Sequence, residues 1–177
     1  MNPDRPKRSV EQLRESYEET LDALRRRVEQ LEAAVAQFQP DFDESAFSAA
    51  WHSDSPLERN RADNVLSSFE KTYMLLMDLI TLSVKLGRRL HAVNVDASRS
   101  PVETLRELKI LSANAEEALA IQREVRNSSQ HVYVELTVSN LRRAVMLQLE
   151  TSARVIHAIT AWVDSPDPMQ QEGEQRP

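Results

Sequence analysis

Apolar residues recur every three or four positions along most of this chain, which is the spacing of one face of an α-helix. The first stripe predicts a helix of about 30 residues, roughly 45 Å long, that ends before Pro40. Such a helix is longer than a small bundle needs. Part of its stripe therefore packs on a second subunit, or the helix lies along the edge of its own bundle. The stripe consists of Val10, Leu13, Tyr17, Leu21, Leu24, Val28, Leu31, Val35 and Phe38.

Three more helical stretches follow, and serines mark where helices begin. Ser9, Ser55 and Ser100 each stand three residues before a Gln or Glu, which is the pattern of a capping box. The second helix fades by Val93. The third runs from Ser100 to Arg126 with a pause at Ser112 and a new cap at Asn114, and the fourth runs from near Glu135 to Trp162. We therefore predict an all-α, up-and-down four-helix bundle with a long N-terminal helix and a kinked third helix.

Composition supports one helical domain. The chain has 177 residues, 41% of them hydrophobic, and only two glycines, which favours long helices over turns and sheets. We expect a disordered lead-in at residues 1–8 and a helical domain at residues 9–163, with a connector at 41–54. The last segment, residues 164–177, is rich in Pro, Gln and Glu and is expected to be a disordered acidic tail.

Several classes of chemistry find no support in the sequence. The chain has no cysteine, and we found no run of 18 apolar residues, no glycine-rich phosphate loop and no metal-ligand spacing. We therefore expect a cytoplasmic protein with no membrane span, no cofactor and no bound metal.

The net charge of −6 argues against a surface that binds nucleic acid everywhere. An RNA-binding function would need a local basic site. Candidates are Lys85–Arg89, Arg142-Arg143, Arg123 and Arg126, although each of these alone is also what a solvated helix face contains.

The stretch from Arg126 to Tyr133 brings an arginine, an amide, a histidine and a phenol together. On an unbroken helix, residues five apart point about 140° away from each other, so Arg126 and His131 could not share a site. Asn127, Ser128 and Ser129 compete for backbone hydrogen bonds and favour caps and turns. We therefore predict a helix break here, across which the two side chains converge.

This arrangement suits RNA cleavage without a metal. An arginine at a helix C-terminus can hold a phosphate through its planar fork. In the first turn of the next helix, His131 lies in a positive field that keeps its ring neutral and able to accept a proton. His131 would then take the proton of a ribose 2′-OH while Arg126 stabilises the phosphorane. The structural alternative is a capped helix break with a partly buried, hydrogen-bonded histidine.

Two further polar residues lie among apolar neighbours. Asp78 interrupts the run from Leu75 to Ile80, and a carboxylate is costly to bury without a partner. We expect Asp78 to hold the Arg126 guanidinium in place, or else to face water between two apolar stripes. His157 lies in the apolar part of the last helix and is expected to be a hydrogen-bonded core histidine.

The pattern Arg126-Asn127-x-x-x-His131-x-Tyr133 resembles the R-N-x-x-x-H-x-Y signature of the HepT family of HEPN-domain ribonuclease toxins. The similarity extends from about Ser55 to Ala161. It includes the helix with an acidic residue at Asp78 and the Leu108–Ser112 segment that precedes the Arg-Asn helix.

The resemblance implies a metal-independent endoribonuclease toxin that works as a homodimer on an RNA substrate. Arg126, Asn127 and His131 would form its catalytic set. It also implies a cognate nucleotidyltransferase antitoxin that silences the toxin by transferring AMP to Tyr133. Two other classes remain open. One is a non-catalytic helical dimerisation or interaction protein that retains the motif, and the other is a phosphate- or nucleotide-sensing bundle with Arg126 as an anion clamp.

Overall fold

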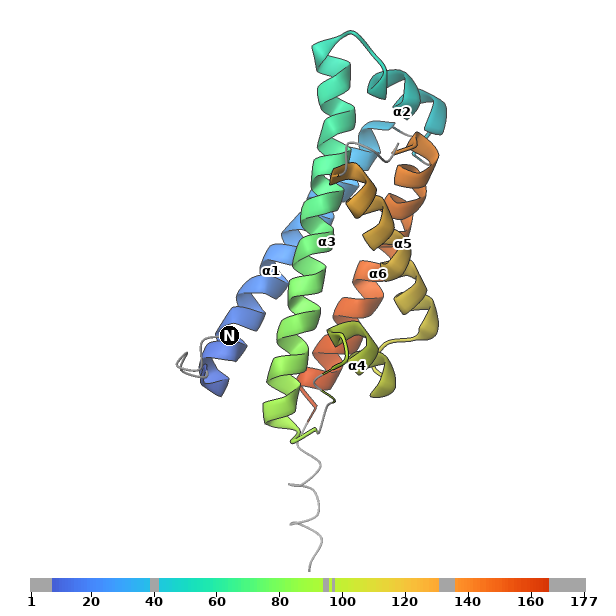
Figure 1. Cartoon of the computed structure of the whole chain (residues 1–177). Helices are drawn as coiled ribbons and strands as arrows, with labels where there is room; N and C mark the ends of the chain where they lie inside the picture. Colours follow the sequence, from blue (N-terminus) through green and yellow to red (C-terminus); the bar gives the residue numbers. More distant parts are fainter. Residues whose placement is uncertain (1–7, 39–41, 94–95, 97, 131–135, 166–177) are drawn as a thin grey trace, which may run out of the picture.

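The computed structural model describes residues 8–38, 42–93, 96, 98–130 and 136–165. Every regular element in these ranges is a helix, which confirms the all-α class. Figure 1 shows that the long helices α1, α3, α5 and α6 alternate in direction along the chain. The elements are α1 (Val10–Val35), the 3-10 turn η1 (Ala36–Phe38), α2 (Glu44–Trp51), α3 (Pro56–Leu90), α4 (Pro101–Glu107), α5 (Ala113–Gln130) and α6 (Val138–Val163).

The third predicted helix is two separate helices instead of one kinked helix. Helix α4 ends at Glu107, and Lys109 then adopts a left-handed backbone conformation with φ of 59°. The next helix starts at Ala113, where the Ser112 hydroxyl oxygen accepts a hydrogen bond of 3.2 Å from the Ala115 backbone N–H. Ser112 is therefore the residue that caps α5, and the cap predicted at Asn114 is wrong.

The stripe of α1 is buried inside this chain. Seven residues of α1 are buried, and α1 packs along α3 (Figure 1). Of the two alternatives for this helix, the one in which it lies along its own bundle is therefore correct for the buried part of the stripe. The buried α1 residues are Leu13, Tyr17, Leu21, Leu24, Leu31, Ala34 and Val35.

The core consists of two hydrophobic clusters separated by a polar layer. On α3, Phe69 belongs to one cluster and Leu76 to the other; on α5 the boundary falls between Val125 and Leu119. Buried polar side chains occupy the boundary. We call Thr72, Gln122, Gln148 and Ser152 the polar layer. All four residues are fully buried.

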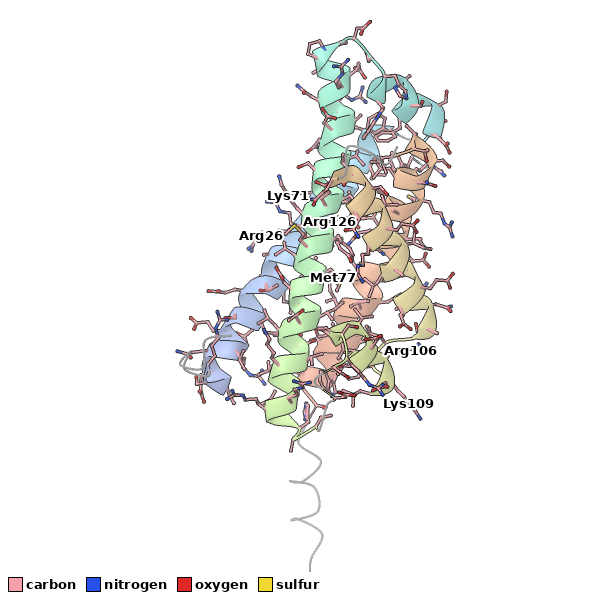
Figure 2. All side chains as sticks on the ribbon, viewed as in Figure 1. Arg26, Lys71, Met77, Arg106, Lys109 and Arg126 are labelled. Carbon is pink, nitrogen blue, oxygen red and sulfur yellow. The ribbon has the colours of Figure 1, made fainter. Side chains whose placement is uncertain are left out.

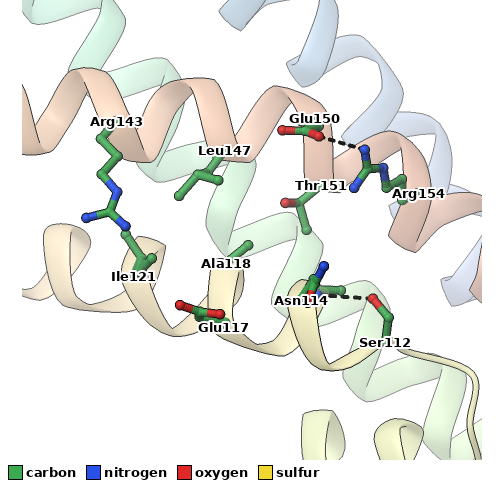
Figure 3. Close-up of a pocket in the computed structure, with 11 residues that line it drawn as sticks. Ser112, Asn114, Glu117, Ala118, Ile121, Arg143, Leu147, Glu150, Thr151 and Arg154 are labelled. Atoms are coloured by element: carbon green, nitrogen blue, oxygen red, sulfur yellow. Dashed lines mark hydrogen bonds and ion pairs between the residues drawn. The ribbon is translucent and has the colours of Figure 1, made fainter.

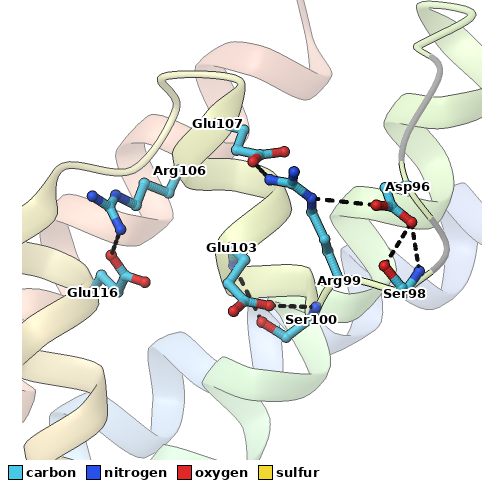
Figure 4. A network of polar contacts seen from close by, with 8 residues as sticks. All are labelled: Asp96, Ser98, Arg99, Ser100, Glu103, Arg106, Glu107 and Glu116. Carbon is cyan, nitrogen blue, oxygen red and sulfur yellow. Dashed lines mark hydrogen bonds and ion pairs between the residues drawn. The ribbon is translucent and has the colours of Figure 1, made fainter.

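The start of α4 is fixed by a network of charged and polar contacts that Figure 4 shows. Arg99 forms ion pairs with Asp96 and Glu107, and Arg106 pairs with Glu116 of α5 at 2.8 Å. The Ser100 backbone N–H donates to the Glu103 carboxylate at 2.7 Å. These contacts hold α4 beside α5, where it forms one wall of the groove described below.

Two other features complete the fold. His157 is exposed, so its predicted place in the core is wrong; the neighbouring buried positions on α6 are Val155 and Ile159. Among the described residues, each helix is either too short or too polar to cross a bilayer.

Candidate functional site

Helix α5 continues through Arg126 and ends at Gln130, so the break predicted at Asn127–Ser129 is wrong. The reason lies in the two serines. The Ser128 hydroxyl donates to the Glu124 carbonyl at 3.0 Å, and the Ser129 hydroxyl donates to the Arg126 carbonyl at 2.7 Å. Both bonds return to the preceding helical turn, which a helix interior accommodates.

The last helix begins at Val138, not near Glu135. The Thr137 hydroxyl oxygen caps it by accepting from the Asn140 backbone N–H at 3.2 Å. The first turn of α6 therefore does not contain His131. Both His131 and Tyr133 lie outside the described residues, so their predicted roles remain predictions.

Arg126 lies half-buried near the end of α5, and Figure 2 labels it in front of the middle part of α3. Its Nη1 donates a long hydrogen bond of 3.4 Å to the Asn127 side-chain oxygen. Its Nε is buried and has no hydrogen-bond partner among the described residues. The Ser129 hydroxyl shares its one proton between the Arg126 carbonyl and the Glu70 carboxylate, which ties the end of α5 to α3. The structure thus brings Arg126 and Asn127 together and anchors their helix.

Asp78 does not support Arg126. The Asp78 side chain is exposed, and no ion pair joins it to Arg126 in the described part of the chain. The alternative in which Asp78 faces water is correct. Leu76, Leu79 and Ile80 face the core of the bundle, and Asp78 lies on the opposite side of the same helix.

Tyr73 on α3 is a site residue that the sequence did not single out. It is buried, and burial raises the pKa of its phenol above the usual value, whereas Arg123 and Arg126 act to lower that pKa. Both guanidinium groups are therefore close enough to Tyr73 to influence it. In the sequence, Tyr73 is only one of the regularly spaced apolar positions in the helix predicted after Ser55.

A groove of about 490 Å³ lies beside this cluster, between α3, the start of α4, and α5. Apolar side chains and the Tyr73 ring form part of its lining, and Arg123 and Asn127 border it on α5. We call it the α3/α5 groove. It is lined by Tyr73, Met77, Ser100, Pro101, Val102, Glu103, Glu116, Leu119, Ala120, Arg123, Glu124 and Asn127.

A second groove of about 280 Å³ runs between α5 and α6, and Figure 3 shows its lining. It contains Arg143 and Arg154, but Arg154 forms an ion pair of 2.6 Å with Glu150. Arg142 donates from Nε to the Phe42 carbonyl at 2.6 Å, so this guanidinium serves the packing of the segment before α2. This groove is therefore a weaker candidate for binding an anion than the Arg123/Arg126 region.

The structure does not gather the predicted basic residues into one patch. The Ser129–Glu70 bond places Arg126 near the middle of α3, whereas Lys85, Arg88 and Arg89 lie near its C-terminal end. At 1.5 Å per residue, Arg88 is about 22 Å further along α3 than Tyr73. Only Arg123 and Arg126 of the proposed basic set remain at the candidate site.

Among the described residues, acidic and histidine side chains form no group of three that could hold a metal ion. Comparison of the chain with protein-family models, curated proteins and solved structures finds no match in any of the three. The resemblance to HepT-like proteins therefore rests on the Arg126–Tyr133 signature and its flanking helices.

Proposed function

We propose that this protein is a metal-independent endoribonuclease toxin of the HepT type, with Arg126, Asn127 and His131 as its catalytic residues. The observation that carries the proposal is the placement of Arg126. Arg126 is half-buried and hydrogen-bonded to Asn127. A second arginine, Arg123, also lies close enough to Tyr73 to influence the pKa of its phenol. Arg123 and Asn127 also border the α3/α5 groove. The RNA substrate and the absence of cysteine fit a cytoplasmic protein.

The proposed reaction is an attack of the ribose 2′-oxygen on the adjacent phosphorus. His131 accepts the 2′-OH proton, and the Arg126 guanidinium stabilises the charge that develops on the phosphorane. The bond from phosphorus to the 5′-oxygen then breaks, and the leaving oxygen takes up a proton. The products are a 2′,3′-cyclic phosphate end and a 5′-hydroxyl end.

The test is cleavage of RNA in excess EDTA by the full chain. The parent protein should cleave and leave 2′,3′-cyclic phosphate ends, whereas Arg126→Ala and His131→Ala should each lose cleavage by a factor of at least about 100. Arg154→Ala is the matched control, because Arg154 lies on α6 in an exposed ion pair with Glu150. Circular dichroism checks that every variant keeps its helical content. Full activity of His131→Ala would show that this histidine is not the base.

A non-catalytic interaction protein is the second candidate. The observation that favours it is the unbroken course of α5, in which Ser128 and Ser129 serve helix packing and the anchor to Glu70. In that case the Arg-Asn pair would serve the same packing. A parent protein that cleaves no RNA under any of these conditions, yet loses stability in Arg126→Ala, would favour this second function.

Tyr133 is the proposed control point of the toxin. A nucleotidyltransferase antitoxin would transfer AMP to its phenol, and the added phosphodiester would compete with the RNA phosphate for Arg126. Co-expression with the antitoxin followed by intact mass measurement should show one or more AMP units, and Tyr133→Phe should lose them and remain toxic. If the antitoxin neutralises Tyr133→Phe fully and the parent protein shows no mass change, Tyr133 is not the switch.

A further inference from the structure

Four buried side-chain atoms in the described part of the chain have no hydrogen-bond partner. They are Nε2 and Oε1 of Gln122, Nε of Arg126 and Oε1 of Gln148. Two of these atoms are donors and two are acceptors. Buried polar groups in proteins are nearly always hydrogen-bonded, because leaving one unpaired costs its full desolvation free energy. The numbers of donors and acceptors match, so the four atoms can satisfy one another.

The helices place these atoms in reach of one another. Gln122 and Arg126 are one turn apart on the same face of α5, where side chains are neighbours. Helices α5 and α6 pack antiparallel: Ala118 and Thr151 line one groove between them, and Val125 and Asn140 line the next. This register places Gln122 within about one turn of Gln148.

The polar layer adds a second reason. Gln122 and Gln148 are both fully buried at the boundary between the two hydrophobic clusters. Gln148 already donates from Nε2 to the Ser152 hydroxyl oxygen at 3.3 Å, which leaves its Oε1 to accept. The relay described below uses this orientation of the Gln148 amide, with Nε2 toward Ser152 and Oε1 toward Gln122.

We propose that a buried hydrogen-bond relay, Arg126–Gln122–Gln148–Ser152, orients the Arg126 guanidinium. The Arg126 Nε–H donates to Gln122 Oε1, and the Gln122 Nε2–H donates to Gln148 Oε1. Both bonds would form by rotation of the two glutamine side chains.

The relay determines which edge of Arg126 faces outward. With Nε held toward the interior, the Nη groups remain for Asn127 and for an anion at the surface of α5. Gln122 is thus a positioning residue, and it acts through Arg126 without touching the substrate. Its catalytic consequence rests on the proposed ribonuclease function, but the relay itself is a property of the free protein.

The decisive experiment is NMR on the full chain without RNA. The Nε–H signal of Arg126, assigned by its loss in Arg126→Lys, should exchange slowly with water. Gln122→Met removes the acceptor at similar side-chain volume and should speed this exchange at least about tenfold. Gln122→Glu keeps an acceptor for Arg126 and should keep the exchange slow. Gln148→Met should shift the side-chain amide signals of Gln122.

Thr72→Val is the matched control. Thr72 is buried in the same polar layer, but its hydroxyl donates to the Ser68 carbonyl at 2.7 Å and takes no part in the relay. This variant should leave the Arg126 Nε–H exchange unchanged. If Gln122→Met also leaves it unchanged, or if Thr72→Val speeds it as much as Gln122→Met does, the relay is wrong.

Activity separates this inference from the proposed function. If the parent protein cleaves RNA, Gln122→Met should lower kcat about tenfold with little change in KM, while Thr72→Val retains the parent kcat. Relay signals in a protein that cleaves no RNA would support the relay and contradict the ribonuclease. Cleavage with an unchanged exchange rate in Gln122→Met would contradict the relay alone.

Discussion

At the scale of single residues, Gly87 shows how a neighbouring side chain can require glycine at a position inside a helix. A glycine inside a long helix is destabilising relative to alanine unless space requires it. A Cβ at position 87 would overlap the six-membered part of the Trp162 indole ring, which lies directly against the α3 backbone. Trp162 is close to the end of α6, so this contact holds the ends of α3 and α6 together.

Gly87→Ala should therefore destabilise the protein by about 1–3 kcal/mol, because the indole ring must move out of a packed site. Urea unfolding followed by circular dichroism measures the change. Trp162→Leu provides the control, since a smaller side chain leaves room for the added methyl group. Gly87→Ala should cost much less in the Trp162→Leu background. Equal costs in both backgrounds would mean that the ring does not require glycine here.

Asp78 and His157 illustrate a limit of residue-level reasoning. Each stands within an apolar segment, yet each is exposed, because side chains of adjacent residues on a helix point about 100° apart. Local sequence shows the neighbours along the chain, whereas burial depends on which face another helix covers. The pairing of α3 and α6 with the remaining helices decided that face.

At the scale of elements, the three predicted capping boxes have different outcomes. Ser9 and Ser100 form complete boxes, in which the serine side chain and the side chain three residues later exchange hydrogen bonds with the backbone. Ser55 occupies the same position before α3, but its side chain makes no capping bond. Pro56 at the start of α3 lacks an N–H and already provides a helical φ, so the start of this helix depends less on the serine.

Ser9→Ala should therefore cost about 1 kcal/mol of stability, whereas Ser55→Ala should cost less than about half of that. Both serines precede long helices; the two sites differ in the capping bond and in Pro56, which follows Ser55. Chemical denaturation of both variants beside the parent protein gives the comparison. Equal losses would show that the capping bond at Ser9 does not stabilise α1.

At the scale of the whole molecule, α3 passes through both hydrophobic clusters and the polar layer between them. This arrangement brings the anchor of α5, Ser129 with Glu70, close to the level of Thr72 and Tyr73. The candidate site thus lies beside the centre of the molecule. Met74 is 50% exposed and stands one turn after Glu70 on α3.

We expect a homodimer in which two Arg126/His131 sites face one shared cleft. A single site has no evident second proton donor for the leaving 5′-oxygen, and two-fold symmetry would bring in a second histidine. Light scattering at micromolar concentration should give twice the mass of one chain. Met74→Glu should weaken the dimer because it puts a charge beside the site. Met146→Glu, at a methionine of α6 that is 42% exposed, serves as the control. A fully active monomer would rule out the shared cleft.

The sequence by itself determined the helical class and the extents of α1 and α3 to within a few residues. These features depend on hydrophobic periodicity, prolines and local capping, all of which act within a few residues of chain. The stop of α4 and the unbroken course of α5 were missed. The stop of α4 goes with the left-handed backbone at Lys109, and the course of α5 goes with the bonds of Ser128 and Ser129 to the preceding turn.

Tertiary structure alone decided which polar groups surround Arg126. Tyr73 and Glu70 lie far from Arg126 in sequence; helix packing brings Tyr73 near Arg126 and joins Glu70 to Ser129, three residues further along α5. Periodicity states that a residue faces inward but not what it meets there, because the register between helices is set by the packing of both surfaces. For the same reason, the polar layer and the unpaired buried atoms of Gln122, Arg126 and Gln148 can be recognised only in the tertiary structure.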